Sequence, residues 1–382
     1  MDFDFNDEQR MLKDSVEKLL QGRYDFDARR KFSASPEGFS REIWAAFAEM
    51  GLLALPFSED DGGLGAGPVE TMITMEAFGR ALVVEPYLPS VILCGGLLRH
   101  AGSEAQRAEH IPAIAAGERL FAFAHAERQA RYDHFDVAVA AQRDGDGYVI
   151  HGEKGLVLSG DSADWLVVSA RTSGERRDKD GISLFLVEAN APGITRRGYA
   201  TQDGARAAEV SFENVRVSDD ALLGPLDEAL PLIERVTDEA IAALCAEAVG
   251  VMEDMHGATV EYLKVRNQFG THIGAFQVLQ HAAADMFIAL EQGRSMAMYA
   301  TMMAREDDVN ERARAVAAAK VQIGRSCKFV GENTVQLHGG VAVTMEYKVA
   351  HAFKRATMID KLFGDADHHL ARVCDLGGVI GD

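Results

Sequence analysis

The chain has 382 residues, with 59 acidic against 39 basic side chains and a formal net charge of −20. Nucleic-acid binding depends on lysines and arginines that neutralise phosphates, so this balance argues against a nucleic-acid partner. It also disfavours docking on an anionic membrane surface. Hydrophobic residues make up 47% of the chain and charged residues 26%, which is the composition of a folded globular protein. The length predicts two or three domains.

The cysteine spacing and the hydropathy of the chain bear on metal sites, disulfides and cellular location. The four cysteines (Cys94, Cys245, Cys327 and Cys374) lie far apart without a CxxC pair, so neither a zinc site nor a disulfide framework is predicted. No charged start followed by a long apolar run appears, so we expect no signal peptide or transmembrane helix. These features predict a soluble protein of the cytoplasm, without a metal site.

The first third of the chain has helical periodicity. Asn6 and Gln9 have the spacing of a capping box before a run of apolar residues at helical intervals. Similar patterns run through residues 39–53 and 69–82. The glycine-rich segment 59–68 follows no strand pattern and is acidic, so we interpret it as a surface turn rather than a phosphate loop.

Near residue 120 the period changes to that of short strands. Residues 137–141 alternate, and the turn 144–147 leads into a second apolar run at 148–150. Further β-rich runs follow, with Gly, Asp or Pro between them, at 156–158, 165–170, 182–187 and 209–212. Regular short strands with turn residues between them predict a small antiparallel β-barrel or sandwich.

Helical periodicity then returns and holds to the end. The stretches 230–264, 275–305 and 313–335 exceed the usual helix length, which indicates a helical bundle. We therefore predict a mainly α fold with a β middle domain. The predicted boundaries are 1–118 for the N-terminal helical domain, 119–226 for the β domain and 227–382 for the C-terminal bundle.

Two glycine-containing motifs occur at the ends of long helices. Arg266–Gly270 ends one helix, and Gln336–Gly340 pairs two glycines with hydrogen-bonding side chains. Glycines allow close backbone approach to a phosphate or ribose, and Arg266 could pair with a pyrophosphate. Either motif alone also fits an ordinary helix connector, but their occurrence together in a bundle is more specific.

Over essentially its whole length the chain resembles the acyl-CoA dehydrogenases. The similarity rests on Phe5–Gln9, Gly152–Lys154, Ala163–Trp165, Phe212–Val217, Arg266–Gly270, Phe276-Gln277, Gln336–Gly340 and Glu346-Tyr347. Within that family the chain is most similar to the small subunit of pimeloyl-CoA dehydrogenase and related bacterial subunits. The resemblance implies a fold of N-terminal helices, antiparallel β-barrel and C-terminal four-helix bundle, assembled as a tetramer.

The resemblance also implies an activity. Desaturating a thioester needs a carboxylate that removes the α-proton and an electron sink for the β-hydride. The implied cofactor is FAD, the substrate an acyl-CoA of β-oxidation, and the electron acceptor an electron-transfer flavoprotein. The residues matching the family's FAD contacts are Arg266, Phe269, Gln277, Gln336, Gly339 and Gly340. In the family these residues reach across a dimer interface.

The positions of the usual catalytic base have changed. Phe363 stands at the C-terminal base position and Ala240 at the alternative position, and neither side chain can take a proton. Glu239 lies beside Ala240 but about 100° further round the helix. Glu247 lies two turns along the same face as Ala240 and is the substitute base that we consider. Of the two interpretations of Glu247, we favour a helix carboxylate in a packing or salt-bridge role.

Positions that face the flavin and the acyl chain in the family have changed as well. Ala126 and Leu156–Leu158 replace residues that bond or stack against the ring, and Arg131-Tyr132 replaces two small residues of the acyl loop. Arg131 could pair with the distal carboxylate of a dicarboxylyl-CoA. Two hypotheses follow. The chain is either an acyl-CoA dehydrogenase subunit with an unusual base, or a non-catalytic partner or acyl-CoA-binding assembly protein. In the second case it completes the FAD site of a large subunit, in a heterotetramer rather than a homo-oligomer.

Overall fold

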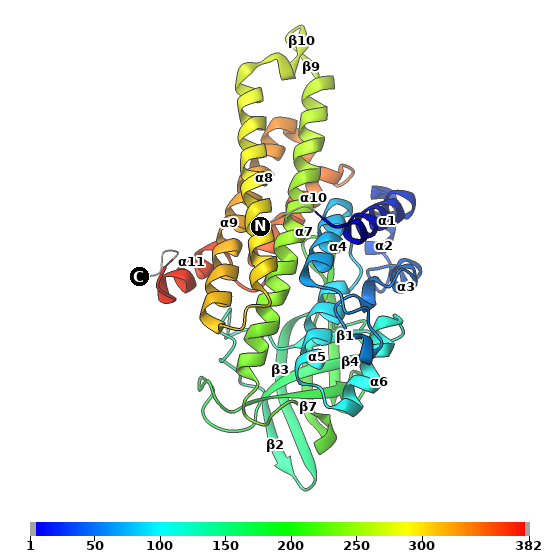
Figure 1. Cartoon of the computed structure of the whole chain (residues 1–382), viewed down its shortest axis with the longest axis vertical. Helices are drawn as coiled ribbons and strands as arrows, with labels where there is room; N and C mark the ends of the chain where they lie inside the picture. Colours follow the sequence, from blue (N-terminus) through cyan, green and yellow to red (C-terminus); the bar gives the residue numbers. More distant parts are fainter. Residues whose placement is uncertain (1–4, 379–382) are drawn as a thin grey trace. The chain divides into compact units, whose positions relative to one another are not determined.

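The computed structural model describes residues 5–378 (Figure 1). The α-helices are α1 (Asp7–Arg23), α2 (Phe26–Ser33), α3 (Arg41–Glu49), α4 (Pro68–Ala81), α5 (Gly95–Ala101), α6 (Glu104–Ala115), α7 (Leu230–Val265), α8 (Gln277–Met303), α9 (Val309–His338), α10 (Lys348–Lys361) and α11 (Ala366–Asp375). The strands are β1 (Phe121–Ala124), β2 (Ala140–Asp144), β3 (Gly147–Leu158), β4 (Trp165–Arg171), β5 (Ile182–Glu188), β6 (Ile194–Ala200), β7 (Arg206–Ser218), β8 (Leu222–Leu223), β9 (Asn267–Gln268) and β10 (Thr271–His272). None of the described helices is both long and apolar enough to cross a membrane.

The described residues form two compact units. The helical unit takes the segment through Lys31, Pro68–Val83 and the chain from Ile241 onward. The sheet unit takes Phe32–Gly67 and Val84–Ala240. The three predicted domains follow the type of secondary structure rather than compactness, and their boundaries stay a prediction.

The sheet unit is organised around one sheet with the strand order β6-β7-β3-β2-β4-β5-β8, and β1 lies beside β4. Its pairings are antiparallel, as predicted, except that β1 and one residue pair of β2 run parallel to β4. Apolar side chains from these strands, such as Ile150, Val168 and Phe185, form a core without solvent exposure. The predicted hairpin is confirmed, because Asp144 pairs with Gly147 across a two-residue turn.

Several strands differ from the sequence prediction: β1 and β8 were not predicted, β7 is longer than the predicted run 209–212, and β3 and β6 differ as follows. β3 is one long strand that includes 156–158, and its register with β7 is irregular between Lys154 and Val157. Leu156 has a φ of 47° at this irregularity. β6 was not predicted, because its exposed edge position places Arg196 and Arg197 where an apolar pattern would be expected.

The helical unit begins with the predicted cap. The Asn6 side chain accepts from the Gln9 amide, and Gln9 returns a hydrogen bond to the Asn6 amide, which completes a capping box. α4 and α7 pack backbone to backbone at two glycines. A Cβ added at Gly79 would collide with the Glu247 carbonyl, and one at Gly250 with the Glu76 carbonyl. This close packing fixes the stretch of α7 that carries Glu247.

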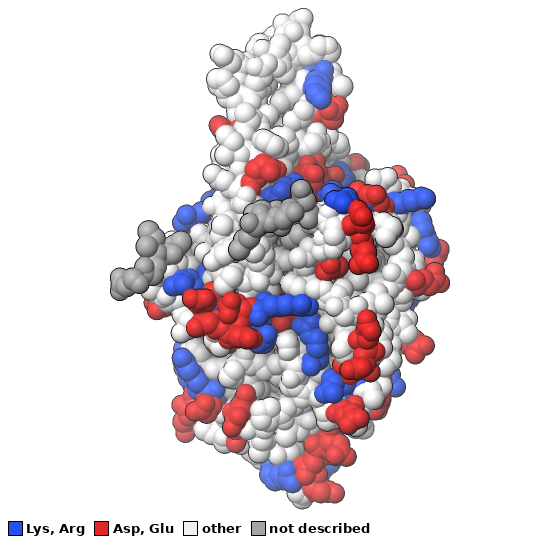
Figure 2. Space-filling model, viewed as in Figure 1, with Lys and Arg blue, Asp and Glu red and all other residues white. Residues whose placement is uncertain are grey.

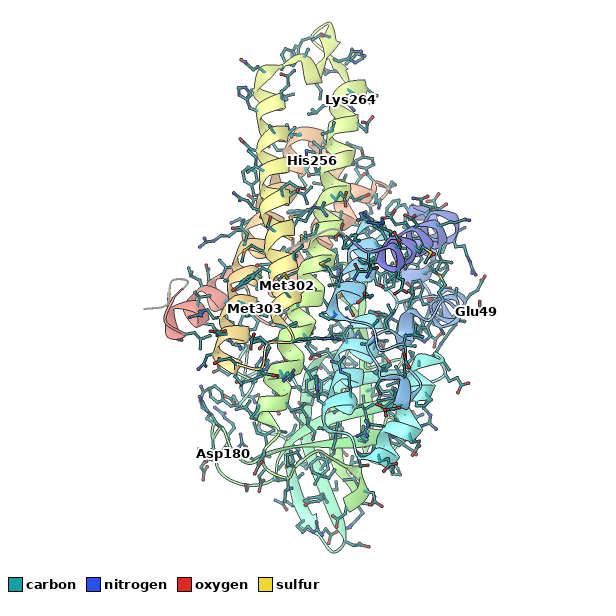
Figure 3. All side chains as sticks on the ribbon, viewed as in Figure 1. Glu49, Asp180, His256, Lys264, Met302 and Met303 are labelled. Atoms are coloured by element: carbon teal, nitrogen blue, oxygen red, sulfur yellow. The ribbon has the colours of Figure 1, made fainter. Side chains whose placement is uncertain are left out.

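α7 and α8 run side by side to the β9–β10 hairpin at their shared end (Figure 1). His256 lies on the α7 side of this pair (Figure 3), where its Nε2 is 3.2 Å from the Ala283 carbonyl of α8. Figure 2 shows few charged side chains at the hairpin end. Large apolar side chains are exposed there instead, including Val265 at 66%, Phe269 at 91% and Val278 at 70%.

Candidate active site

The loop that holds Phe363 joins α10 to α11. Phe363 has a φ of 58° and Gly364 a φ of 108°, so this turn adopts a conformation that L residues rarely take. The His369 Nε2 donates to the Phe363 carbonyl at 2.9 Å. His369 is 1% exposed, and burial lowers its pKa to about 3, so the ring is neutral. The loop conformation is therefore held although its side chain cannot act as a base.

Lys320 of α9 holds the same loop from within the helical unit. Its fully buried ammonium donates to the carbonyls of Ile359, Asp360 and Gly364, each at 2.8 Å. Burial lowers the pKa of Lys320. Three carbonyl partners satisfy all three donors of this ammonium group and close the C-terminal end of α10.

The second base position has no acid–base group. Ala240 is fully buried. The neighbouring Glu239 carboxylate lies 2.6 Å from the Arg99 guanidinium and 2.8 Å from the His100 ring. Burial alone would raise the pKa of Glu239, but the His100 hydrogen bond and the Arg99 charge hold it below its ordinary value. Glu239 is thus a paired carboxylate.

Glu247 is paired even more completely. Its two carboxylate oxygens accept from Arg355 of α10, Oε1 from Nε at 2.6 Å and Oε2 from Nη2 at 2.7 Å. The Glu247 side chain is 4% exposed and that of Arg355 15%. A buried, bidentate arginine partner occupies both oxygens that would take a proton. This geometry matches the salt-bridge interpretation of Glu247.

The six predicted FAD residues all lie in the helical unit, in two groups. Arg266, Phe269 and Gln277 surround the β9–β10 hairpin, and Gln336, Gly339 and Gly340 lie where α9 ends. A ring contact between Tyr262 of α7 and His338 of α9, with centroids 4.5 Å apart, links the two helix ends. The structure thus brings both groups to one end of the bundle.

The predicted FAD residues are largely exposed to solvent. Arg266, Gln277 and Gln336 are exposed, and Arg266 has no ion-pair partner among residues 5–378. A Cβ added at Gly339 or Gly340 would meet nothing within 4 Å. Gly339 has a φ of 68°, but Gly340 has no such conformation to explain its glycine. Exposed donors beside open glycines fit a phosphate-bearing group held from outside this chain.

Comparison with family models decides the family. The models for the N-terminal, middle and C-terminal domains of acyl-CoA dehydrogenase match residues 6–118, 122–215 and 232–375. The chain belongs to the acyl-CoA dehydrogenase family. The predicted fold class is confirmed, and the chain is an oxidoreductase of this family. Membership supports the prediction of FAD as cofactor.

Relatives of this family match along their full length. The chain is 28% identical to the probable acyl-CoA dehydrogenase YngJ of Bacillus subtilis, over 94% of this chain and 95% of that protein. It is 26% identical, with a TM-score of 0.87, to a chain in the ChsE4–ChsE5 complex from Mycobacterium tuberculosis, over 98% of both chains. It is also 26% identical, with a TM-score of 0.90, to a chain in a structure described as the electron transferring flavoprotein of Acidaminococcus fermentans, over 98% of both.

The flavin-side positions of acyl-CoA dehydrogenases lie in the sheet unit and carry different chemistry here. Leu156 is 42% exposed and presents an apolar side chain. Arg131 has a φ of 52°, so the acyl loop also retains an uncommon backbone conformation. Ala126 contributes only its backbone, through a hydrogen bond from the Gly155 amide to its carbonyl at 2.8 Å. The side chains of Ala126 and Leu158 have no hydrogen-bonding atoms to offer a flavin ring.

The sequence analysis missed a polar cluster below these positions. Lys154 is buried and its ammonium lies 2.7 Å from the Glu127 carboxylate and 2.9 Å from the Ser169 hydroxyl. His125 and His134 continue this line of contacts. Gly152–Lys154 was noted only for its resemblance to the family. No spacing along the chain shows that β3 and β4 bring these side chains together.

Proposed function

We propose that this chain is a subunit of an FAD-dependent acyl-CoA dehydrogenase assembly, in which it completes the FAD site of a catalytic partner. Three observations support this proposal. Neither Phe363 nor Ala240 can accept a proton, and Glu247 is bound by Arg355. The predicted FAD residues Arg266, Gln277 and Gln336 are exposed. The pairing of Glu247 is the observation that carries it, because it removes the remaining carboxylate that we considered as a base.

The assembly would desaturate an acyl-CoA thioester between its α and β carbons. FAD, when bound, supplies the electron sink for the hydride. This chain would hold the adenosine diphosphate end of FAD. Arg266 would pair with the pyrophosphate, and the open backbone at Gly339 and Gly340 would allow the cofactor to approach closely. Electrons would leave to an electron-transfer flavoprotein. The similarity to chains in heteromeric and flavoprotein structures supports both partners.

A variant pair tests the FAD role. Arg266→Gln removes the exposed guanidinium, and Lys264→Gln, two residues earlier on α7 (Figure 3), removes a cation that pairs with Glu261 at 2.6 Å. Both changes remove one positive charge from the same end of the helix. We expect the flavin content of the assembly to fall several-fold for Arg266→Gln and to stay at the wild-type level for Lys264→Gln. Equal flavin content in both variants would count against the proposal.

The alternative function is catalysis by this chain alone, with Glu247 as the base. The observation that favours it is the burial of Glu247 two turns along α7 from Ala240. Under this alternative, the purified chain desaturates acyl-CoA without a partner, and Glu247→Gln abolishes that activity while leaving flavin binding intact.

The substrate class has its own test. Arg131 is exposed and could bind the distal carboxylate of a dicarboxylyl-CoA. Arg128, three residues earlier and with its side chain 94% exposed, is the matched control. We expect Arg131→Ala to weaken binding of a dicarboxylyl-CoA but not of its monocarboxyl analogue, and Arg128→Ala to affect neither. Equal weakening of both ligands by Arg131→Ala would remove the dicarboxylyl hypothesis.

A further inference from the structure

A line of five hydrogen-bonding side chains crosses the sheet unit and has no part in the proposed function. His134 Nδ1 lies 3.2 Å from His125 Nε2, and His125 Nδ1 lies 2.9 Å from Ser169 Oγ. Lys154 Nζ donates to Ser169 Oγ at 2.9 Å and to Glu127 Oε1 at 2.7 Å. We call these five residues the histidine–lysine chain. Each residue in it lies within hydrogen-bonding distance of the next.

The histidine–lysine chain is buried at one end and partly exposed at the other. Ser169 is fully buried, Lys154 is 1% exposed and Glu127 6%, whereas His134 is partly exposed. His125 stacks on Phe123 with ring centroids 5.2 Å apart, which fixes its ring plane. The path thus connects an accessible imidazole to a buried ion pair.

A structural ion pair explains part of this arrangement but not all of it. Glu127 also accepts from the Ala138 and Val139 amides, so the Lys154–Glu127 pair has a clear role in fixing the loop 127–139. The two imidazoles add nothing to that role. Burying the ring nitrogens of His125 costs free energy unless both are hydrogen-bonded, and the line of contacts satisfies both of them.

The contacts allow two proton arrangements. Only one of the two facing nitrogens of His125 and His134 can carry a hydrogen, because each must donate to or accept from the other. In one arrangement Lys154 is an ammonium, the Ser169 hydroxyl donates to His125 Nδ1, and His125 Nε2–H donates to His134 Nδ1. In the other, Lys154 is a neutral amine that still donates to Glu127, and the three hydrogen bonds Lys154–Ser169, Ser169–His125 and His125–His134 are reversed.

We propose that His134 is an acid–base site that exchanges a proton with the Lys154–Glu127 pair through His125 and Ser169. When a weak acid gives a proton to His134 Nε2, His134 Nδ1–H passes to His125 Nε2 and His125 Nδ1–H passes to Ser169 Oγ. The Ser169 hydroxyl hydrogen then passes to the neutral Lys154 amine. One proton enters and one ammonium forms, and both imidazoles end neutral. The positive charge finishes beside Glu127 rather than beside the acid that lost the proton.

The charges and pKa values of the histidine–lysine chain favour this proton transfer. Burial lowers the pKa of Lys154 to about 8, with Glu127 opposing the shift, so the amine form is accessible near neutral pH. Burial, with the charges of His134 and Lys154, lowers the pKa of His125 well below its ordinary value, so His125 passes protons without holding one. Arg171 of β4 is a further cation whose charge interacts with Glu127. Its guanidinium is bound by the carbonyls of the loops around it, such as Phe135 and Asp180.

Imidazole NMR on the full chain tests this proposal without FAD or acyl-CoA, so its outcome is independent of the proposed function. The histidine ring nitrogens are followed between pH 5 and 10, and His125→Gln and His134→Gln assign the signals. We expect the His134 signal to respond to two coupled steps, one of them the titration of Lys154, separated by more than about one pH unit. Ser169→Ala removes the link to Lys154, and the second step should disappear from His134.

Ser183→Ala is the matched control. Ser183 is also a fully buried serine of this sheet, but it bonds to Thr172 and Asp227 and makes no hydrogen bond to the histidine–lysine chain. The second step at His134 should persist in this variant. If Ser169→Ala does not fold, His125→Gln interrupts the same line and should have the same effect. A His134 signal that shows one ordinary titration in the wild type, or two steps that survive both interruptions, would overturn the proposal.

Discussion

Under the alternative function, catalysis by this chain alone would depend on Glu247. Its carboxylate is almost without solvent exposure and lies in a bidentate contact with Arg355. The arginine fork occupies both carboxylate oxygens, so neither is available to receive the α-proton of a thioester. The carboxylate that we considered as a substitute base therefore lies in a salt bridge.

Replacing one partner of this pair should destabilise the helical unit. Glu247→Gln removes the carboxylate that the mostly buried Arg355 guanidinium binds through two hydrogen bonds, and we expect a loss of about 3 kcal/mol in the free energy of unfolding. The double variant Glu247→Gln/Arg355→Met removes both charges and should recover most of that loss. Urea unfolding of the single and double variants gives this comparison. A Glu247→Gln variant as stable as the wild type would show that the pair is not structural.

Lys154 makes stability depend on pH in the alkaline range. Its pKa is lowered to about 8 in the folded chain, so the unfolded chain binds this proton more tightly at any pH between about 8 and the ordinary lysine value. Folding therefore favours the neutral amine, and this contribution to stability rises with pH across that window.

The expected size is on the order of 1 kcal/mol per pH unit from this group. The difference between the wild type and Glu127→Gln/Lys154→Met isolates it from other lysines and tyrosines. We expect the wild type to gain stability relative to this variant between pH 8 and pH 10 in urea unfolding. A constant difference, or one that changes in the opposite direction, would contradict the lowered pKa.

At the scale of elements, the loop between α10 and α11 is held by contacts to its backbone. Lys320 binds three carbonyls around this loop, and His369 binds the Phe363 carbonyl. These contacts involve the backbone alone, so the side chain at position 363 can change without altering the turn. This explains how a phenylalanine can stand in a left-handed conformation at the family's base position.

Lys320→Met should therefore loosen this loop. It leaves three buried carbonyls without a donor, and we expect a loss of at least about 2 kcal/mol in unfolding free energy. Amides of the loop and of the start of α11 should exchange hydrogen faster. Lys361→Met is the control, because Lys361 is 54% exposed and pairs only with Asp360 and Asp365 at the surface. It should change stability by no more than about 0.5 kcal/mol.

The end of α9 offers the opposite case. Gly340 has open space around its Cβ position and no left-handed conformation, so Gly340→Ala should leave the stability of the isolated chain within about 0.5 kcal/mol of the wild type. In the flavin-bearing assembly the added methyl should hinder the approach of the cofactor and lower flavin content. Calorimetry of the chain and the flavin absorbance of the assembly separate the two effects. A stability loss in the isolated chain would indicate a packing role instead.

Much of the fold could be predicted from the pattern of elements. The capping box at Asn6 and the hairpin that closes at Gly147 follow from local chemistry, because both depend on residues within a few positions of one another. The edge strand β6 could not be found, since Arg196 and Arg197 on an exposed edge follow no apolar alternation.

Of the candidate site, only the residues that belong to a recognisable sequence motif could be predicted. The FAD residues came from motif resemblance, and their open glycines and exposed side chains are consistent with that prediction. The partner of Glu247 could not be predicted, because Arg355 lies 108 residues away in sequence. The histidine–lysine chain likewise depends on the pairing of β3 with its neighbours, which no spacing in the sequence determines.

For the whole molecule, the net charge of −20 sets the context of the proposed function. FAD and CoA are themselves polyanions, so an acidic chain must present local positive charge to bind them. Arg266 does so at a bundle end where Figure 2 shows few acidic side chains. The exposed apolar residues around it, such as Phe269 and Val278, suit burial against a partner subunit.

The flavin count per assembly tests the central claim most directly. The chain is purified alone and together with a catalytic acyl-CoA dehydrogenase subunit, and flavin absorbance and acyl-CoA desaturation are measured for both preparations. We predict little flavin and no desaturation for the chain alone, and fewer flavins than subunits, with activity, for the complex. One flavin per subunit and desaturation by the chain alone would contradict the account.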